Sequence, residues 1–265
     1  MWTDKLAFIG AGNIAEVIID RLVTLGSLTP SHIFACDIRA DRRAYLRERF
    51  RGIHTSEDPR EAVQFARCII IATPADAVAP VMREIHPAFK ADHIVVCLAT
   101  SVPLAQLEKL AGETAVVRAL MNTPSLVGEG MNLVAFGSRV SLDYRMRISA
   151  LLDMFGPKFE VSDVQMNFWT AICAAGPTYV FPVIQALANA VMARGIGHEQ
   201  ALRGASQVVL GAARMVQQTG KDPMELEKLS ASLRTLHEDE IHKLYTEAYE
   251  DALRRLKEVA AAIVG

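Results

Sequence analysis

Two patterns of apolar and polar positions divide this chain into halves. Through about residue 136, short unbroken apolar runs alternate with stretches whose apolar residues recur at helical spacing. Unbroken runs of this kind are typical of strands in a parallel sheet that is covered on both faces. The alternation predicts an α/β fold with a doubly wound sheet. We expect strands at residues 5–9, 33–37, 68–72, 93–98, 115–120 and 132–136, and a shorter one around residues 53–54.

The second half shows helical spacing throughout. From about residue 164 we expect helices over residues 179–192, 199–218 and 223–229, and a last helix to residue 264. Residues 177–193 are apolar nearly all round, which predicts a helix buried on more than one side. Because a domain of this size hardly covers such a helix, we expect a second subunit to cover it. The alternative is a central helix wrapped by its own domain.

The first apolar run ends in a glycine turn that reads G-A-G-N-I-A at residues 10–15. The turn follows a strand and opens an amphipathic helix, which is the context that the dinucleotide fingerprint G-x-G-x-x-G/A requires. Gly10 permits the sharp turn, and Gly12 lets backbone N–H groups approach a pyrophosphate. The alternative is a purely structural glycine turn. We therefore predict a Rossmann-type dinucleotide-binding domain over residues 1–162 and an all-helical dimerisation and substrate domain over residues 163–265.

The carboxyl ends of the predicted strands should meet around one crevice. Asp37, 22 residues after Ala15, stands where an acidic side chain accepts hydrogen bonds from an adenosine ribose, which favours NAD. Arg39, Arg42 and Arg43 follow at once and could neutralise the 2′-phosphate of NADP. The three arginines slightly favour NADP, and NAD remains the alternative. The residues that we expect to bind the cofactor are Gly10, Ala11, Gly12, Asn13, Ile14, Asp37, Arg39, Thr73, Pro74, Ala99 and Asn122.

Composition narrows the class of protein. The 265 residues carry a formal net charge of -2, so no basic surface argues for nucleic acid or an anionic membrane. Apolar stretches fall short of the roughly 18 uninterrupted residues of a membrane span, and the chain enters its first strand without a leader pattern. Cysteines are far apart and lack C-x-x-C spacing, which favours buried reduced thiols in a cytoplasmic protein over disulfides or a metal site. They are Cys36, Cys68, Cys97 and Cys173.

Several motifs resemble the pyrroline-5-carboxylate reductase family. F-I-G-A-G-N-I at residues 8–14 is similar to the family's F-I-G-x-G-N-M, and R-A-L-M-N-T-P-S-L-V-G-E-G-M at residues 118–131 to its R-x-M-P-N-T-P-x-x-V-x-x-G-M. A-A-G-P-T-Y-V-F at residues 174–181 resembles G-S-G-P-A-Y-x-F, and G-A-A-R-M at residues 211–215 fits G-A-A-K-M. The resemblance implies a Rossmann domain, a helical dimerisation domain and an active site between subunits. It also implies reduction of a cyclic imine to proline with NADPH or NADH.

The chain departs from the family in the loop expected to bind the substrate. The family's S-P-G-G-T-T becomes L-S-A-S-L-R-T-L-H at residues 229–237, without the Pro and both Gly that let such a loop wrap a small carboxylate. One register places Thr235 at the family's catalytic Thr, which hydrogen-bonds the imine nitrogen. A gapless register places His237 there. We expect Thr235 to be catalytic and the substrate to be bound by Ala175, Gly176, Pro177, Ser232 and Arg234.

Two features of this region have simpler structural alternatives. The N–H groups of the Gly176-Pro177 turn could meet an anion at a helix start, or the pair could merely begin a helix. His237 and His242 could donate protons, or could be solvated beside Glu238, Asp239 and Glu240. We expect a homodimer or higher homo-oligomer that acts on a small-molecule imine. The remaining hypotheses are a reductase of another imine or imino acid and a catalytically silent dinucleotide-binding paralogue.

Overall fold

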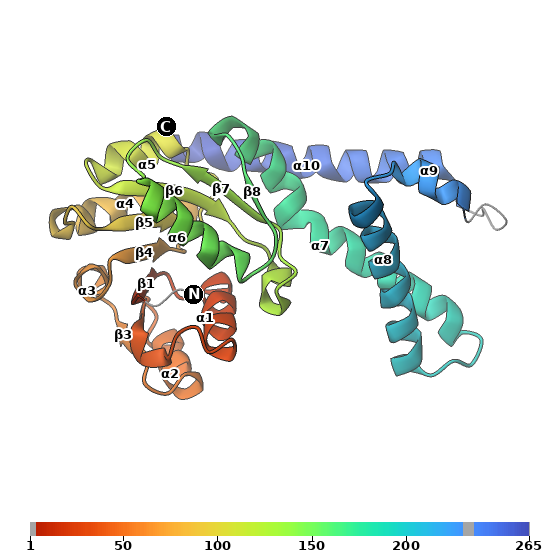
Figure 1. Cartoon of the computed structure of the whole chain (residues 1–265), viewed down its shortest axis with the longest axis horizontal. Helices are drawn as coiled ribbons and strands as arrows, with labels where there is room; N and C mark the ends of the chain where they lie inside the picture. Colours follow the sequence, from red (N-terminus) through yellow and green to blue (C-terminus); the bar gives the residue numbers. More distant parts are fainter. Residues whose placement is uncertain (1–3, 230–235, 265) are drawn as a thin grey trace. The chain divides into compact units, whose positions relative to one another are not determined.

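The fold is described from a computed structural model, which describes residues 4–229 and 236–264 (Figure 1). The chain forms two compact units. Unit one comprises Met1–Ala174 and Asp251–Gly265, and unit two comprises Ala175–Glu250. Two long helices, α7 (Asp163–Met192) and α10 (Glu238–Val264), contribute residues to both units. The functional domain boundary expected at residues 162 and 163 stays a prediction. By compactness the chain divides between residues 174 and 175 and between residues 250 and 251.

Unit one is built on an eight-stranded sheet in the order β3-β2-β1-β4-β5-β6-β7-β8. Neighbouring strands are parallel except β6 and β7, which pair antiparallel. The predicted doubly wound α/β sheet is confirmed. Strand β8 was not predicted, because its residues are mostly exposed and form no apolar run. The strands are β1 (Leu6–Ile9), β2 (Ile33–Cys36), β3 (His54–Ser56), β4 (Cys68–Ile71), β5 (Ile94–Cys97), β6 (Ala115–Leu120), β7 (Asn132–Phe136) and β8 (Lys158–Glu160).

Helices cover both faces of this sheet, as the unbroken apolar strands require. Alternate residues of β1 point to opposite faces: Leu6 and Phe8 belong to one buried cluster, Ala7 and Ile9 to the other. Helices α1, α2 and α6 supply the first cluster, and α3, α4 and α5 the second (Figure 1). The helices of unit one are α1 (Asn13–Thr24), α2 (Ala40–Arg49), α3 (Pro59–Phe65), α4 (Ala75–Ile85), α5 (Leu104–Ala111) and α6 (Leu142–Asp153), with 3-10 turns η1 (Pro30–His32), η2 (His86–Ala88) and η3 (Thr123–Val127).

The cysteines lie where the apolar runs predict. Cys36, Cys68, Cys97 and Cys173 are all buried and free of disulfides. Burial raises the pKa of Cys36, Cys68 and Cys173 to about 12, and that of Cys97 to about 11. Because the thiolate is the reactive form, these four side chains are inert packing groups.

Unit two consists of helices alone among its described residues. It contains the second part of α7, α8 (His198–Thr219), α9 (Pro223–Glu227) and the first part of α10. Helices α7 and α8 pack through small side chains, Ala188 against Ala201 and Ala205, which permits close approach of the two backbones. Tyr179 on α7 donates a hydrogen bond to the Ala248 carbonyl oxygen of α10, at 3.1 Å.

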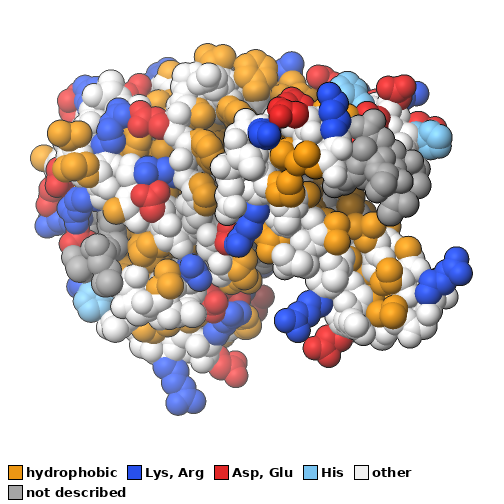
Figure 2. All heavy atoms as spheres, turned by 45° about the vertical axis from the view of Figure 1, so that its right-hand side comes forward, with side chains coloured by type: hydrophobic (Ala, Val, Ile, Leu, Met, Phe, Trp, Pro, Cys, Tyr) orange, Lys and Arg blue, Asp and Glu red, His pale blue; other side chains and the backbone are white. Residues whose placement is uncertain are grey.

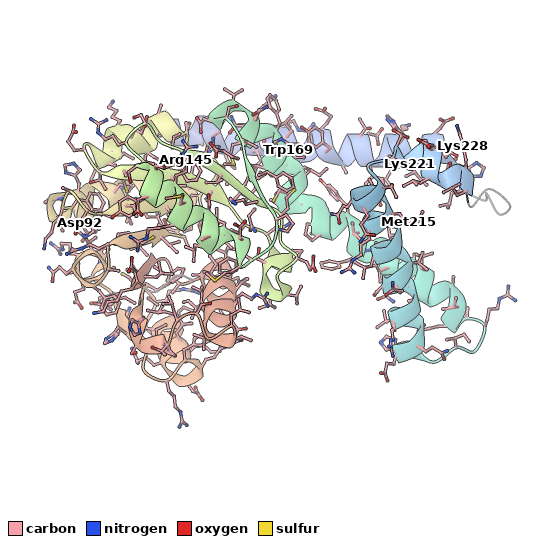
Figure 3. The ribbon with its side chains drawn as sticks, in the orientation of Figure 1. Asp92, Arg145, Trp169, Met215, Lys221 and Lys228 are labelled. Carbon is pink, nitrogen blue, oxygen red and sulfur yellow. The ribbon has the colours of Figure 1, made fainter. Side chains whose placement is uncertain are left out.

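Helix α7 is not wrapped by its own unit. It is packed by α8 along one side and leaves large apolar side chains exposed elsewhere, as Figure 2 shows at the surface of these helices. Met215 on α8 and Trp169 on the first part of α7 are likewise exposed (Figure 3). Among the described residues, the covering of α7 by its own unit is therefore incomplete, and covering by a second subunit stays the expectation. The exposed apolar residues of α7 in unit two are Val180, Phe181, Val183, Leu187 and Val191.

By length and composition alone, α7 could also cross a membrane, since its mean hydropathy reaches 1.5. Core helices of globular proteins meet the same criterion. Met166, Ala171 and Cys173 of this helix are buried in unit one, which accounts for part of its apolar character. The expectation that the protein has no membrane partner stays a prediction.

Candidate functional site

The carboxyl ends of β1, β2 and β4 border a cleft of about 950 Å3. This edge includes the switch point of the sheet, where the chain order reverses between β1 and β4 and where ligands of such folds bind. Six residues predicted to bind the cofactor line the cleft, namely Gly10, Gly12, Asp37, Arg39, Thr73 and Pro74.

The two glycines of the turn, Gly10 and Gly12, have different structural roles. Gly10 has φ of +87°, and a Cβ there would lie 2.7 Å from the backbone of Ala72, so only glycine fits this crossing of β1 and β4. A Cβ on Gly12 would meet no atom within 4 Å. Gly12 is the N-cap of α1, so its open side lies at the N-terminus of a twelve-residue helix. Unpaired N–H groups and the positive end of the helix dipole make this a site for an anion.

Thr73 gives a second indication of a ligand in the cleft. Its hydroxyl oxygen is buried and has no hydrogen-bond partner in the structure. Buried hydroxyl groups are nearly always hydrogen-bonded. An unpartnered hydroxyl in the open cleft that Gly12 also lines fits a polar ligand that completes the hydrogen bonding of Thr73. The residues present therefore fit a bound dinucleotide.

The remaining residues of the turn lie at or beside the start of α1. Ala11 is fully buried, and its N–H donates to Asp37 Oδ2 at 3.0 Å. Asn13 and Ile14 form the first turn of α1. Their backbone N–H groups are the unpaired donors of this helix start.

The acidic residue after β2 is already engaged within the protein. The side chain of Asp37 is only 9 % exposed, and its Oδ1 accepts a hydrogen bond from the Arg39 backbone N–H at 2.9 Å. Arg39 itself is 56 % exposed and lines the cleft. Arg39 Nε also pairs with Asp37 Oδ1 at 3.4 Å, which holds a cationic side chain beside the position expected for the adenosine ribose.

Arg42 and Arg43, which could also neutralise a 2′-phosphate, are both engaged in contacts within the protein. Arg42 Nε donates to the Ala11 carbonyl oxygen, and Arg42 also forms an ion pair with Glu16. Arg43 donates to the Asp37 carbonyl oxygen at 2.7 Å and pairs with Glu57 at 3.0 Å. Neither residue lines the cleft, so of the three arginines only Arg39 is placed to meet a 2′-phosphate.

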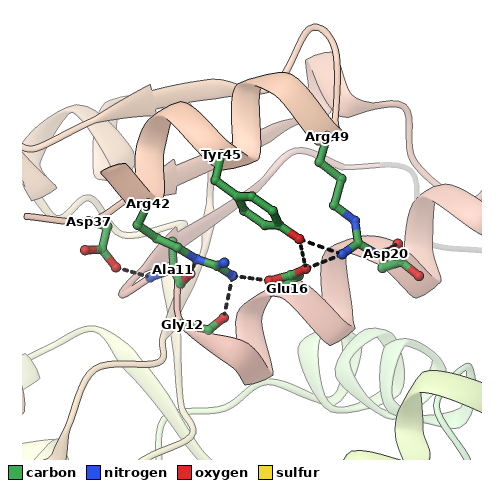
Figure 4. A network of polar contacts seen from close by, with 8 residues as sticks. All are labelled: Ala11, Gly12, Glu16, Asp20, Asp37, Arg42, Tyr45 and Arg49. Atoms are coloured by element: carbon green, nitrogen blue, oxygen red, sulfur yellow. Dashed lines mark hydrogen bonds and ion pairs between the residues drawn. The ribbon is translucent and has the colours of Figure 1, made fainter. Parts of the chain in front are cut away.

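Sequence reasoning missed the polar network behind the glycine turn (Figure 4). Glu16, in the first turn of α1, is bound by Arg42, Tyr45 and Arg49 of α2. Burial alone would raise the pKa of Glu16, but the hydrogen bonds from Arg42 and Tyr45 outweigh it and hold this pKa below its ordinary value of 4.5. The spacing of residues 42, 45 and 49 on one face of a helix was the available signal.

A buried arginine organises the next loop along the sheet edge. Arg118 on β6 is 1 % exposed and donates to the Asp163 carboxylate and to the Thr100 carbonyl oxygen. Arg118 Nη2, which donates to Thr100, also donates to the side-chain amide oxygen of Asn167 at 2.6 Å. Arg118 therefore ties the loop after β5, which contains the predicted cofactor residue Ala99, to the first turns of α7.

Asn122, predicted to bind the cofactor, uses its side chain inside the protein. It is buried, and its Nδ2 donates to the Cys173 carbonyl oxygen at 3.1 Å. Its Oδ1 accepts from the Met131 backbone N–H at 3.0 Å. The side chain is therefore anchored within the protein, and the Asn122 backbone carbonyl oxygen also accepts from the Ser125 N–H at 3.0 Å.

The predicted helix start at residues 175–177 is wrong. Helix α7 begins at Asp163 and runs through Ala175, Gly176 and Pro177 without a break. These residues present no helix N-terminus to an anion. A proline inside a helix lacks only one hydrogen bond, and the carbonyl that it leaves unpaired, that of Cys173, receives the amide of Asn122 instead.

The remaining substrate-loop predictions cannot be placed. Thr235, Ser232 and Arg234 lie outside the described residues. His237 and His242 are exposed at the start of α10, which favours solvated side chains over buried proton donors.

Comparisons with known proteins bear on the whole chain. The family described as pyrroline-5-carboxylate reductase dimerisation matches residues 163–259, and the family described as NADP oxidoreductase coenzyme F420-dependent matches residues 5–101. The pyrroline-5-carboxylate reductase of Escherichia coli K12 is 31 % identical over 229 residues, covering 86 % of this chain and 85 % of that protein. The enzyme of Pseudomonas aeruginosa is 30 % identical over 270 residues, covering 98 % of each chain.

Solved structures agree. A pyrroline-5-carboxylate reductase from Coxiella burnetii has a TM-score of 0.79 and 28 % identity, covering 97 % of this chain and 99 % of that one. A Plasmodium falciparum pyrroline carboxylate reductase solved with NADP bound has a TM-score of 0.83, covering 98 % and 99 %, and at 20 % identity supports the fold alone. This chain therefore belongs to the pyrroline-5-carboxylate reductase family of NAD(P)-dependent oxidoreductases.

Proposed function

We propose that this protein reduces pyrroline-5-carboxylate to L-proline with NADPH or NADH, the reaction of proline biosynthesis. The cofactor supplies a hydride to the carbon of the C=N bond, and the nitrogen gains a proton. The observation that carries the proposal is the cleft at the β1–β4 switch point, with an open Gly12 and an unpartnered Thr73 hydroxyl in a chain of this family.

The described residues account for cofactor binding and orientation. The N–H groups at the start of α1 would hold the pyrophosphate, and the Thr73 hydroxyl would complete its hydrogen bonding on the ligand. Hydride transfer then depends on holding the imine carbon within about 3–3.5 Å of the donor. The Arg118 network fixes the loop after β5, at the carboxyl end of the strand next to β4.

For the cofactor we favour NADP. Arg39 is exposed in the cleft beside Asp37, whose carboxylate already accepts two backbone N–H groups. A 2′-phosphate would gain a charge-assisted hydrogen bond from Arg39. The test compares kcat/KM for NADPH and NADH in wild type and Arg39→Ala. We expect Arg39→Ala to lower the value for NADPH and spare that for NADH, and equal losses would contradict this assignment.

The substrate contacts rest on the family resemblance. We propose that Thr235 hydrogen-bonds the imine nitrogen and that Ser232 and Arg234 bind the substrate carboxylate. Thr235→Ala should then lower kcat roughly 10- to 100-fold, the loss of one transition-state hydrogen bond. Arg234→Ala should raise KM for the imine more than it lowers kcat. An unchanged kcat in Thr235→Ala would point to the other register, in which His237 holds this position.

A second candidate is a reductase of a different cyclic imine. It is favoured by the loop at residues 229–237, which lacks the Pro and both Gly of the family's motif. NADPH oxidation with a panel of cyclic imines distinguishes the two candidates. If another imine has the higher kcat/KM, the second candidate holds. If no imine is reduced although NADPH binds, the protein is a silent paralogue.

We also propose that residues 163–265 form a homodimer and that the enzyme is cytoplasmic. The segment matches the family's dimerisation region, and its helices expose the apolar side chains named above. Obligate interfaces usually bury more than about 2,000 Å² in total. Sedimentation should give at least a dimer at micromolar concentration, and a folded monomer would refute the assembly.

A further inference from the structure

The glycine turn is held from behind by two side chains of the β2–α2 segment. Both backbone polar groups of Ala11 are engaged there: its N–H donates to Asp37 Oδ2 at 3.0 Å, and its carbonyl oxygen accepts from Arg42 Nε. Arg42 Nη2 also lies 3.4 Å from the Gly12 carbonyl oxygen (Figure 4). Arg42 therefore binds two consecutive carbonyl groups of the turn.

The guanidinium of Arg42 is fixed in this position. Its side chain is 14 % exposed, and its ion-pair partner Glu16 is 16 % exposed. Glu16 is in turn bound by the Tyr45 hydroxyl at 2.9 Å and by Arg49. Arg49 is anchored on Asp20 at 2.7 Å. Arg42 is thus one member of a network that joins α1 and α2, and it has little freedom to turn toward a ligand.

The geometry of the peptide group relates these contacts to the direction of the N–H groups that a cofactor would meet. In a planar trans peptide, the C=O of one residue and the N–H of the next point in opposite directions. With the Ala11 carbonyl directed at Arg42, the N–H of Gly12 is directed away from it. The Gly12 carbonyl, which lies near Arg42, also accepts from the Glu16 N–H at 3.0 Å, so the N–H of Asn13 is directed out of the helix start. Gly12 lines the cleft and Arg42 does not. The clamp therefore presents consecutive N–H donors where an anion would bind.

We infer that Arg42 is a positioning residue for the dinucleotide pyrophosphate, which acts through the Ala11 and Gly12 carbonyls and does not contact the 2′-phosphate. The inference rests on the proposed function, because it assumes that a dinucleotide occupies the cleft. It divides the arginine cluster into two roles. Arg39 distinguishes NADP from NAD, and Arg42 orders the turn that both cofactors share.

The test is titration of NADPH and of NADH into wild type, Arg42→Met, Arg42→Lys and the control Arg39→Ala. Arg42→Met should weaken both cofactors by the same factor, about 10- to 100-fold for the loss of charge-assisted hydrogen bonds. Arg42→Lys, which can still reach one carbonyl, should recover part of that loss for both. Arg39→Ala should weaken NADPH alone. At saturating NADPH, kcat of the Arg42 variants should stay near that of wild type, while KM for NADPH rises.

Two results would overturn the inference. A loss in Arg42→Met that is selective for NADPH would place Arg42 at the 2′-phosphate, and unchanged affinity for both cofactors would remove any positioning role. Thermal unfolding of each variant reports whether the fold survives. If Arg42→Met does not fold, Arg42→Lys and Glu16→Gln, which frees the guanidinium, carry the same comparison of the two cofactors. A folded wild-type protein that binds neither cofactor would instead refute the proposed function itself.

Discussion

The side-chain amide of Asn122 donates a hydrogen bond to the backbone carbonyl of Cys173, with an Nδ2–O distance of 3.1 Å. In an uninterrupted helix that carbonyl would accept from the N–H of residue 177, which is a proline and has none. The Oδ1 of Asn122 accepts from the Met131 N–H at 3.0 Å. Asn122 thereby joins the end of β6, the approach to β7 and the middle of α7, and it satisfies the carbonyl that lets α7 continue through Pro177.

Asn122→Ala should destabilise the protein. It leaves one buried carbonyl and one N–H unpaired, which costs about 2–4 kcal/mol in the free energy of unfolding. Denaturant unfolding measures the loss, with Lys109→Ala on the exposed side of α5 as a control within about 0.5 kcal/mol of wild type. An Asn122→Ala variant as stable as this control would show that water replaces both bonds.

The two glycines of the turn should respond differently to substitution. Gly10→Ala places a Cβ 2.7 Å from the Ala72 backbone at a φ of +87°, so we expect it to lower stability by on the order of 1–3 kcal/mol. Gly12→Val meets open space and should keep the unfolding temperature of wild type while weakening NADPH binding at least about tenfold. Unchanged cofactor affinity in a folded Gly12→Val variant, by calorimetric titration, would contradict a pyrophosphate at this position.

The buried and exposed arginine pairs offer a matched comparison. Arg118→Met removes a 1 % exposed guanidinium from Asp163, Asn167 and Thr100, and should lower the free energy of unfolding by about 2–4 kcal/mol. Arg139→Met breaks a solvent-exposed pair with Glu113 and should leave the free energy of unfolding close to that of wild type. Equal effects of the two substitutions, in denaturant unfolding, would argue against a structural role of the Arg118 network.

Glu16 should make stability depend on pH in the acid range. Its pKa in the folded protein lies below its ordinary value of 4.5. Near that pH the unfolded chain binds more protons than the folded one, so stability rises with pH there. The contribution of Glu16 is complete well above pH 4.5 and is lost as the pH falls through its lower folded-state pKa. Unfolding of wild type and Glu16→Gln between pH 3 and pH 7 should converge at the acid end, and parallel curves would contradict the assignment.

The sequence predicted most of the fold because parallel strands that are buried on both faces leave unbroken apolar runs. Six of the eight strands follow such runs, and β3 follows the short segment predicted around residues 53–54. The sequence predicted Gly10 for a sharp turn, which its φ of +87° supports, and Gly12 for close approach to a ligand, which its open side permits. The close crossing of β1 and β4 at Gly10 was visible only in the structure. Sequence reasoning missed the helix through Gly176 and Pro177, because local rules place proline at a helix start, and the compensating bond from Asn122 comes from 51 residues away.

The separate contacts of the three arginines could not be predicted from the sequence either. Arg39, Arg42 and Arg43 are chemically alike and nearly adjacent, and only the path of α2 over α1 decides which of them faces the cleft. The local pattern of apolar and polar residues does not indicate which side chains contact elements that are distant in the sequence. Hydrophobic periodicity was therefore enough to predict the scaffold. The hydrogen-bond and ion-pair partners of the polar side chains could be identified only from the three-dimensional structure.

The most direct test of the account is NADPH oxidation with pyrroline-5-carboxylate, followed by quantification of L-proline. We predict one proline formed for each NADPH oxidised, at a slow rate because the substrate loop lacks Pro and both Gly, and a strong loss in Gly12→Val at the same NADPH concentration. A wild-type protein that binds NADPH yet forms no proline, and no reduced product from any other cyclic imine, would contradict the proposal that this chain is a working imine reductase.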